Sequence, residues 1–265
     1  MIHTIEVTNT SDSNQTPPVA LITGVGRRVG IGFAVAAKLA SDGFDVGCSF
    51  WSAYDKRMTW GVDGELALAI TARFAESGAR SAMVEADLEQ PESVPALFDQ
   101  VETELGPISV LVMCHAESVD SGILDTSIES FDRHFAVNAR ATWLLIREFG
   151  LRYRMAPGIG RIIAMTSDHT VNNLPYGASK GALDRIALAA AHEFAHLRIT
   201  ANVINPGPTD TGWMSPEIRS QVVTETPLHR IGTPEDAANL VSFLCSSHGG
   251  WINGQLLHSN GGSGS

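Results

Sequence analysis

Short apolar runs alternate with longer amphipathic segments along the chain from residue 19 onward. The apolar runs have the length of buried strands, and we expect strands over residues 19–23, 44–50, 81–88, 108–114, 160–167, 199–207 and 254–262. The intervening segments carry apolar residues at helical spacing, which predicts helices over residues 33–43, 64–78, 91–106, 128–153 (long or broken), 176–197 and 233–246. Such alternation predicts an α/β fold in which a doubly wound parallel β-sheet is flanked by helices, in three layers.

The two ends of this pattern suggest the domain organisation. Residues 1–18 are polar and end in Pro17 and Pro18, so we expect a mobile N-terminal tail. Residues 19–265 show neither an internal repeat nor a linker, and we expect them to form a single domain. The length of 265 residues would by itself also allow two small domains. Hydrophobic residues make up 44% of the chain, which is enough for a sizeable core.

Composition argues against several classes of function. The formal net charge of −11 disfavours a nucleic-acid partner, because phosphate binding needs concentrated Lys and Arg. Cys48, Cys114 and Cys245 are widely spaced, which favours reduced thiols over a disulfide framework or a thiolate metal site. The N-terminus lacks the features of a secretory signal, and no apolar run is long enough to cross a bilayer. We therefore expect a cytoplasmic protein without a membrane partner.

The junction between the first predicted strand and the first predicted helix reads ITGVGRRVGIG, residues 22–32. Gly24, Gly30 and Gly32 permit a tight turn, a close approach of the backbone to a pyrophosphate, and close packing of helix on strand. With Ile31, they begin a helix whose N-terminal N–H groups complement phosphate charge. A glycine triplet is often only a turn, but its position after the first strand predicts a Rossmann-type dinucleotide site.

The choice of nucleotide depends on the residues that follow the second strand. An acidic residue there would bind the ribose 2′-hydroxyl of NAD, but CSFWSAYDK has no carboxylate before Asp55. Arg27 and Arg28 lie in the glycine loop, and Lys56 and Arg57 follow nearby. Positive charge and planar donors suit a 2′-phosphate, so NADP(H) is favoured, with NAD(H) possible. The alternative is that these arginines are solvated loop residues.

The stretch YGASK (176–180) opens the helix after the fifth strand. Tyr176 and Lys180 are four residues apart and therefore share one helix face. A nearby ammonium lowers a phenol pKa, which would make Tyr176 a usable general acid or base. Ser167, at the end of the preceding strand, is placed to hydrogen-bond a substrate carbonyl or alkoxide. The pattern Tyr-x-x-x-Lys alone is common on surface helices, and it gains meaning from the glycine loop and the upstream serine.

These motifs together resemble the short-chain dehydrogenase/reductase family over nearly all of residues 19–262. The supporting stretches are TGVGRRVGIG, EADL, FAVNARA, MTS, YGASK, NPGPTDT, RIGTPEDAA and INGQLLHSNGG. Within this family, the sequence resembles members such as the 3-oxoacyl-carrier-protein reductases. The resemblance implies a Rossmann-fold catalytic domain that reduces a carbonyl, or oxidises the corresponding secondary alcohol, by hydride transfer with a nicotinamide cofactor.

The resemblance also implies a catalytic tetrad of Asn138, Ser167, Tyr176 and Lys180. Tyr176 would exchange a proton with the substrate oxygen, which Ser167 would polarise. Lys180 would hold the nicotinamide ribose, and Asn138 would position a water that links Lys180 to solvent. Asp87 would face the adenine, and Thr209 would touch the nicotinamide amide. Further cofactor contacts are implied for Trp51, Leu88, Cys114, Pro206 and Gly207.

Three departures from the family pattern qualify these expectations. Five residues separate Gly24 from Gly30 where most members have three, as in the divergent enoyl reductases, although the tight YGASK spacing favours carbonyl chemistry. The usual Asn-Asn-Ala-Gly after the fourth strand is here MCHA (113–116), so contacts of the asparagine side chains are lost. The loop between Ser167 and Tyr176 is short, which makes Thr166 the alternative to Ser167.

Two rival functions remain open. The stretch HEFAH (192–196) fits a zinc-hydrolase pattern, with His192 and His196 as ligands and Glu193 as base, but no third ligand follows in LRITANVINPG. A non-catalytic NADP-binding redox sensor or regulator is the other rival. Sensors of this family usually lose the tyrosine or the lysine, and this chain keeps both. We therefore expect an enzyme, without a metal.

The substrate is expected to be a small-molecule carbonyl or alcohol. Its contacts should come from residues 115–121, 168–175 and 211–229, the last of which carries Trp213 and Met214 and is suited to a mobile lid. These loops do not mark a steroid, sugar, acyl thioester or polyol. Analogy with the family suggests a homo-oligomer, either a tetramer or a dimer.

Overall fold

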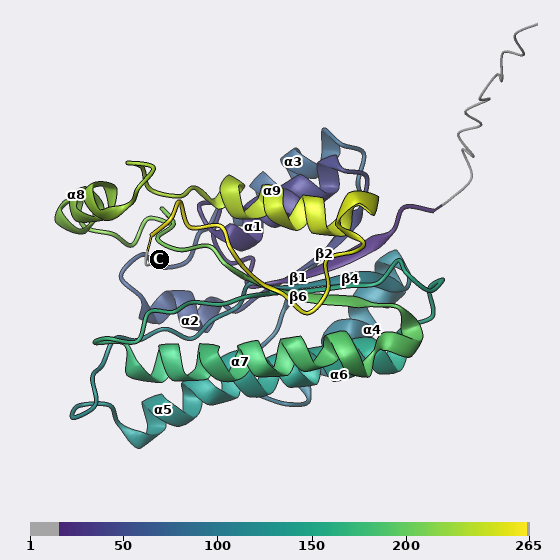
Figure 1. Cartoon of the computed structure of the whole chain (residues 1–265). Helices are drawn as coiled ribbons and strands as arrows, with labels where there is room; N and C mark the ends of the chain where they lie inside the picture. Colours follow the sequence, from purple (N-terminus) through teal and green to yellow (C-terminus); the bar gives the residue numbers. More distant parts are fainter. Residues whose placement is uncertain (1–15, 264–265) are drawn as a thin grey trace, which may run out of the picture.

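The computed structural model describes residues 16–263 and shows one parallel sheet of seven strands in the order β3-β2-β1-β4-β5-β6-β7. The strands are β1 (Val19–Thr23), β2 (Asp45–Phe50), β3 (Ser81–Glu85), β4 (Ile108–Met113), β5 (Arg161–Met165), β6 (Thr200–Asn205) and β7 (Leu256–His258). The doubly wound parallel sheet predicted from the sequence is therefore confirmed (Figure 1). Most of the predicted mobile tail, residues 1–15, lies outside the described residues.

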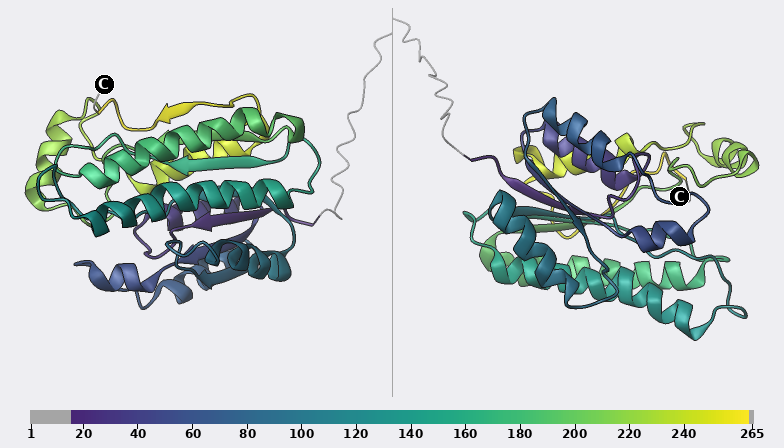
Figure 2. Two further views of the ribbon diagram at one scale, coloured as in Figure 1. Left: turned by 90° about the horizontal axis from the view of Figure 1, so that it is seen from below. Right: turned by 180° about the vertical axis from the view of Figure 1, so that it is seen from behind.

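Helices cover both faces of the sheet (Figures 1 and 2). Those packed on one face are α1 (Ile31–Ser41), α3 (Leu66–Ala75) and α9 (Pro234–Cys245). Those on the other face are α4 (Ser93–Leu105), α6 (Ala141–Arg152) and α7 (Leu174–Glu193). The strands of the centre are buried on both sides, which is why their sequences are apolar without alternation. Within the described residues, no helix has the length and apolar character needed to cross a bilayer.

Several predicted boundaries differ from the structure. The strand expected over 81–88 ends at Glu85, and the one expected over 254–262 is reduced to β7. The helix expected over 128–153 consists of α5 (Ile128–His134), a π-helical turn η1 (Phe135–Arg140) and α6, without a break. Helix α7 begins at Leu174 and ends at Glu193, so its beginning and end both precede the expected ones.

Two short helices were not expected. Helix α2 (Ser52–Arg57) follows β2, and α8 (Pro216–Glu225) lies in the segment expected to form a lid. Helix α8 carries a clear start signal, since the Ser215 hydroxyl accepts a hydrogen bond from the Ile218 N–H and Pro216 occupies the first turn. Helix α2 has only six residues, and its position depends on contacts with distant residues.

The strand order places the candidate site. The chain runs outward from β1 through β2 to β3, and then returns to add β4 on the other side of β1. Because all strands are parallel, their carboxyl ends lie at one edge, and the loops after β1 and β4 diverge there. Such a switch point leaves a crevice in which open α/β sheets bind their ligands.

Candidate active site

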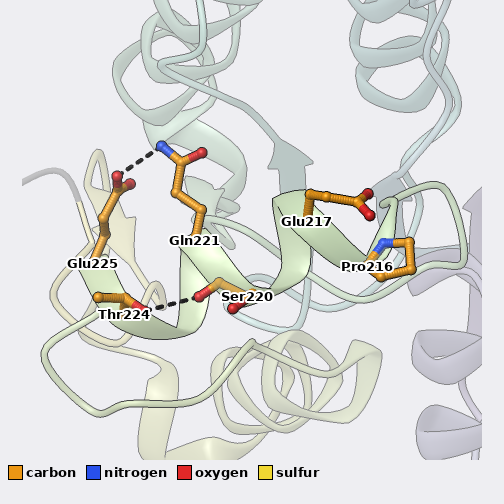
Figure 3. A pocket seen from close by; sticks show the side chains of 6 residues that line it. All are labelled: Pro216, Glu217, Ser220, Gln221, Thr224 and Glu225. Atoms are coloured by element: carbon orange, nitrogen blue, oxygen red, sulfur yellow. Dashed lines mark hydrogen bonds between the residues drawn. The ribbon is translucent and has the colours of Figure 1, made fainter.

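A cleft of about 1190 Å³ lies at the carboxyl edge of the sheet. It runs from the glycine loop and the end of β2, past the end of β4, to the beginning of α7 and the inner side of α8. A second hollow is lined by residues of α8 alone, among them Glu217, Ser220 and Thr224 (Figure 3). Because a single helix cannot enclose a ligand, we take the large cleft as the candidate site.

Most of the residues predicted for cofactor and substrate line this cleft. They are Gly24, Arg27, Gly30, Ile31, Gly32, Trp51, Asp87, Leu88, Cys114, Ser167, Tyr176, Pro206, Gly207 and Thr209. Three predicted residues do not line it. Asn138 and Lys180 are buried next to it, and Arg28 lies outside it.

The glycine loop fits a pyrophosphate. Gly24 has φ +77°, and a Cβ there would lie 2.5 Å from the backbone nitrogen of His115. A Cβ at Gly32 would lie 2.5 Å from the Gly24 carbonyl oxygen, so α1 packs directly on the loop. The first turn of α1 consists of Ile31, Gly32 and Phe33, and its N-terminus opens into the cleft. Uncharged residues there leave the helix N-terminus suited to an anion.

Arg27 is one of the extra residues of this loop, and its side chain contacts two other loops at the cleft. The Arg27 guanidinium donates to the Thr211 carbonyl oxygen at 2.9 Å and lies 4.3 Å from the ring centre of Trp60. The Trp60 Nε1–H donates in turn to Asp55 at 2.9 Å. Burial lowers the pKa of Arg27, while the nearby Asp55 acts in the opposite direction. Arg27 is therefore a held cation between the loop after β2 and the loop after β6.

Arg28 points elsewhere. Its Nε donates to Asp63 at 2.9 Å and its Nη1 donates to Glu65 at 2.7 Å, both outside the cleft. Of the two arginines considered for a 2′-phosphate, only Arg27 thus lies where a nucleotide could reach it. The sequence could not separate them, because the direction of each side chain depends on acids about 35 positions away.

A partly buried ion pair lies beside the cleft, and local sequence did not predict it. Arg57 of α2 donates to both carboxylate oxygens of Glu117, at 2.8 and 3.1 Å. The Glu117 side chain is only 4% exposed, whereas that of Arg57 is 41% exposed. The Tyr54 hydroxyl, also on α2, reaches the Ser118 carbonyl oxygen at 3.5 Å. Helix α2 is thereby fixed to the loop that follows β4.

Tyr176 and Lys180 lie together in the first turns of α7. The Lys180 side chain is 2% exposed, its Nζ donates to the Met165 carbonyl oxygen at 2.8 Å, and it lies 5.6 Å from the ring centre of Tyr176. Ser167 and Tyr176 both line the cleft despite the short loop between them, and Ser167 lies near enough to influence the pKa of Tyr176. The loop is held by a hydrogen bond from the Leu174 N–H to the Ser121 carbonyl oxygen. The geometry thus combines three of the four predicted catalytic residues.

Burial controls the ionisation of this pair. It raises the pKa of Tyr176 to about 12, although the hydrogen bond from Ser167 acts to lower it. Burial also lowers the pKa of Lys180 to about 8, while Cys114 and Asp184 act to raise it. From the sequence, we expected the Lys180 ammonium to lower the phenol pKa. In the protein alone, burial raises this pKa instead.

Asn138 occupies the π-helical turn and acts on the loop after β4. Its Oδ1 accepts from the Glu117 N–H at 2.8 Å, and its Nδ2 donates to the Glu117 carbonyl oxygen and to the Ser179 hydroxyl, each at 2.9 Å. The Asn138 carbonyl oxygen accepts from the Thr142 hydroxyl at 2.8 Å. A π-turn is a frequent feature of functional sites. Here it directs a fully buried amide at the backbone of Glu117 and at α7.

His115 lies in the stretch MCHA (113–116) after β4 and makes two side-chain contacts of its own. Its Nδ1 lies 2.6 Å from the Thr23 hydroxyl, and its Nε2 lies 3.0 Å from the Val137 carbonyl oxygen. Since that carbonyl can only accept, Nε2 carries the proton and Nδ1 accepts from Thr23. Burial and the charge of Lys180 lower the pKa of His115 to about 3, so the ring is neutral at neutral pH. His115 therefore links the end of β1 to the π-helical turn.

The HEFAH stretch does not form a helical pair of ligands. Helix α7 ends at Glu193, and His196 lies in the 3₁₀ turn that follows (Ala195–Leu197). The His196 Nδ1 faces the Glu193 carbonyl oxygen at 3.2 Å. The expected helix over 176–197 is wrong at this end. Among residues 16–263, no group of three or more His, Cys, Asp or Glu side chains is arranged to hold a metal ion.

Known proteins are similar to this chain over almost its whole length. A protein-family model described as "Enoyl-(Acyl carrier protein) reductase" matches residues 24–263. The "Uncharacterized oxidoreductase YjdA" of Bacillus subtilis is 35% identical, over 94% of this chain and 98% of that protein. "NADPH-dependent aldehyde reductase 2, chloroplastic" of Arabidopsis thaliana is 36% identical, over 92% of this chain and 93% of that protein.

Solved structures are similar over the same length. A blue fluorescent protein from a metagenomic library, in complex with NADPH, has a TM-score of 0.83 at 29% identity, over 94% of this chain and 99% of that one. The angucycline C-6 ketoreductase LanV with bound NADP has a TM-score of 0.82 at 29% identity, over 94% and 96%. The chain belongs to the short-chain dehydrogenase/reductase family of oxidoreductases, as its motifs predicted.

Proposed function

We propose that this protein uses NADP(H) to reduce a carbonyl group of a small molecule to an alcohol, or to oxidise the corresponding secondary alcohol. One observation carries the proposal. Tyr176 lines the cleft together with Ser167, directly beside the buried Lys180, and the same cleft holds a glycine loop suited to a pyrophosphate. NADP-bound relatives of the same fold support the cofactor.

The chain's own residues divide the chemistry between them. The nicotinamide cofactor, when bound, supplies or accepts the hydride. A phenol with a pKa raised to about 12 stays protonated at neutral pH, so Tyr176 can donate its proton to the developing alkoxide. Ser167 is close enough to share that oxygen. Lys180 provides positive charge beside Tyr176. We propose that Asn138 positions a water that links Lys180 to solvent.

The residues of the cleft fit a 2′-phosphorylated nucleotide. Arg27 is a held cation on the cleft wall, and Trp51 lies at the end of β2, where NAD-dependent proteins place a carboxylate. These features favour NADP(H) over NAD(H). The cytoplasmic location and the homo-oligomer, either a tetramer or a dimer, belong to the same proposal and rest on the family resemblance.

Reduction of a carbon–carbon double bond is a second candidate, because the family model is described as an enoyl reductase and the glycine loop is long. The four-residue spacing of Tyr176 and Lys180 favours the carbonyl instead, since the lysine then lies beside the phenol. A non-catalytic nucleotide sensor would not need this pair at all.

The proposal is tested by following NADPH and NADH absorbance against ketones, aldehydes, enones and alcohols. We expect NADPH to be consumed with a ketone or an aldehyde, and the Tyr176→Phe protein to bind NADPH without turnover. Tyr153→Phe is the matched control, because the Tyr153 hydroxyl bonds the Ala156 carbonyl oxygen outside the cleft. Full activity of Tyr176→Phe, or exclusive reduction of enones at their double bond, would overturn the proposal.

A further inference from the structure

The cleft continues beyond Tyr176 into a half that has mostly apolar walls. The segment of residues 211–225, called the lid segment below, contributes Trp213, Met214, Ile218 and Val222 to the lining. The loops after β4 and β5 contribute Val119 and Val171. Trp213 is 50% exposed and Ile218 is 42% exposed, although both are large apolar side chains. Such exposure inside a cleft indicates apolar contact with a ligand.

The charged groups of this half are acidic. Asp120 and Asp168 line it from the loops after β4 and β5, and Glu225 lines it from the end of the lid segment. The Glu225 carboxylate is held in place by the Gln221 amide, which donates to it at 2.8 Å on the same side of α8 (Figure 3). All three acidic residues are exposed.

Cations near this half are already engaged. The Arg219 guanidinium of α8 is bonded to Asp210, and the Arg57 guanidinium is bonded to Glu117. Of the described residues that line the cleft, the basic ones are Arg27, which lies at the glycine loop, and the imidazoles of His115 and His169. His115 is neutral, as its lowered pKa shows. The far half therefore presents negative potential to an incoming ligand.

We infer that the substrate is an uncharged, largely apolar carbonyl compound, and that acyl thioesters of coenzyme A or of an acyl carrier protein are not substrates. The inference rests on the proposed function and adds the chemical class of the substrate to it. Thioester carriers bring phosphate groups, and carrier proteins bring further negative charge. Both would approach the carboxylates of Asp120 and Glu225, and the described residues that line this half of the cleft offer no free Lys or Arg to compensate.

The test compares two ketones that share one ring system and differ in charge. The probes are 2-acetylnaphthalene, which is neutral, and 6-acetyl-2-naphthoic acid, which is an anion at neutral pH, with acetoacetyl-CoA as a third. At low ionic strength we expect kcat/KM with NADPH to be at least about tenfold higher for the neutral ketone than for either anion. Salt at about 0.5 M screens exposed charges, so it should raise the value for the anions and leave that for the neutral ketone unchanged.

Charge reversal within the cleft locates the effect. Asp120→Lys and Glu225→Lys should each raise kcat/KM for the naphthoic acid several-fold. Glu129→Lys on α5 is the control of equal charge change, because Glu129 is exposed and does not line the cleft. Equal turnover of the acid and the neutral ketone, or preferred turnover of acetoacetyl-CoA, overturns the inference.

Binding separates this inference from the proposed function. Quenching of tryptophan fluorescence reports binding of both naphthalene probes to the NADPH complex, since Trp213 lines the cleft. Tighter binding of the neutral probe supports the inference even if neither probe is turned over, and equal affinities overturn it. Absence of turnover with every carbonyl tested counts against the proposed function alone.

Discussion

Arg57 and Glu117 lie 60 positions apart in the chain and form a two-pronged ion pair at the wall of the cleft. The Glu117 carboxylate is almost completely buried, and the backbone of the same residue donates one hydrogen bond to the Asn138 side chain and accepts another from it. One residue is thus held by α2 through its side chain and by the π-helical turn through its backbone. The nucleotide side of the cleft depends on this double attachment.

Breaking this ion pair should weaken both the fold and nucleotide binding. Arg57→Met leaves the Glu117 carboxylate buried and unpaired, which we expect to lower the free energy of unfolding by about 2 kcal/mol. This is less than the cost for a fully buried pair, because Arg57 is partly exposed. The dissociation constant for NADPH should rise, since Tyr54 and Trp60 line the cleft next to α2. Urea denaturation and fluorescence titration measure the two effects.

The control for this variant is Arg73→Met, which removes an exposed pair with Glu76 on α3. We expect a change of less than about 0.5 kcal/mol there. The double variant Arg57→Met with Glu117→Gln should recover part of the stability, because no carboxylate is then left uncompensated. Additive losses in the double variant would show that the two groups act independently.

The second prediction distinguishes the two loop arginines. Arg27→Ala should weaken NADPH binding by about tenfold or more, which corresponds to one charge-assisted contact, and should affect NADH much less. Arg28→Ala also removes one positive charge from the loop, but Arg28 lies outside the cleft and is paired with Asp63 and Glu65. Its affinity for NADPH should stay within about twofold of the unchanged protein. Equal losses in the two variants would contradict the assignment of Arg27.

The third prediction concerns pH. Burial lowers the pKa of Lys180 to about 8 and raises that of Tyr176 to about 12. Between neutral pH and pH 10, the lysine therefore loses its charge while the phenol keeps its proton. We expect kcat/KM for carbonyl reduction to fall as pH rises through about 8, and to lie on a plateau below that value.

Lys180→Arg supplies the check on this assignment. A guanidinium keeps its charge throughout the range, so any residual activity of this variant should be flat up to pH 10. A descending limb that stays near pH 8 in Lys180→Arg would assign it to another group.

The fourth prediction tests the buried His115 of the loop after β4. His115→Leu leaves the Thr23 hydroxyl and the Val137 carbonyl oxygen buried without their partner. We expect a loss of about 2–4 kcal/mol in the free energy of unfolding. Adding Thr23→Val removes one of the stranded groups, so the double variant should be less damaged than the sum of the two single variants. Strict additivity in urea denaturation would rule out the bond between Thr23 and His115.

The fifth prediction concerns the start of α9. The Asp236 carboxylate accepts from the Thr233 N–H at 2.8 Å and pairs with Arg230, which lowers its pKa to about 2. A carboxyl group with a lowered folded-state pKa stabilises the fold above its unfolded value near 4, and this contribution is lost as pH falls toward 2. Asp236→Ala should therefore cost about 1 kcal/mol at pH 7. The difference should narrow below pH 4, and Glu235→Ala should cost much less at any pH.

Local sequence was sufficient for the sheet and for most of the helices. Buried parallel strands and amphipathic helices differ in period, and this difference is visible without any knowledge of contacts. Helix α2 was not predicted, because six residues cannot form a stable helix alone. The Arg57–Glu117 pair that holds it joins positions far apart in the chain. The sequence contains a helix start signal for α8 at Ser215 and Pro216. This signal was not used, because a mobile lid was expected there.

In the candidate site, too, local motifs could be predicted from the sequence and contacts between distant residues could not. Glycine spacing and the YGASK stretch indicated the residues that line the cleft, because each motif is local. The partners of His115 and Arg28 could not be predicted, since Thr23 and Asp63 meet them only in the folded chain. The raised pKa of Tyr176 is also a product of burial, which the motif alone does not report.

The π-helical turn between α5 and α6 holds one residue more than an α-helical turn of the same height. Each residue of an α-helix advances the side-chain direction by roughly 100°. Deleting one residue between Phe135 and Arg140 would therefore restore a regular α-helical turn without rotating α6 relative to α5. The buried side chains Leu145 and Phe149 would stay on the sheet, whereas the side chains inside the turn would change direction and Asn138 would lose its contacts with Glu117. A single inserted residue lets one continuous helix serve the catalytic machinery at one end and the core at the other.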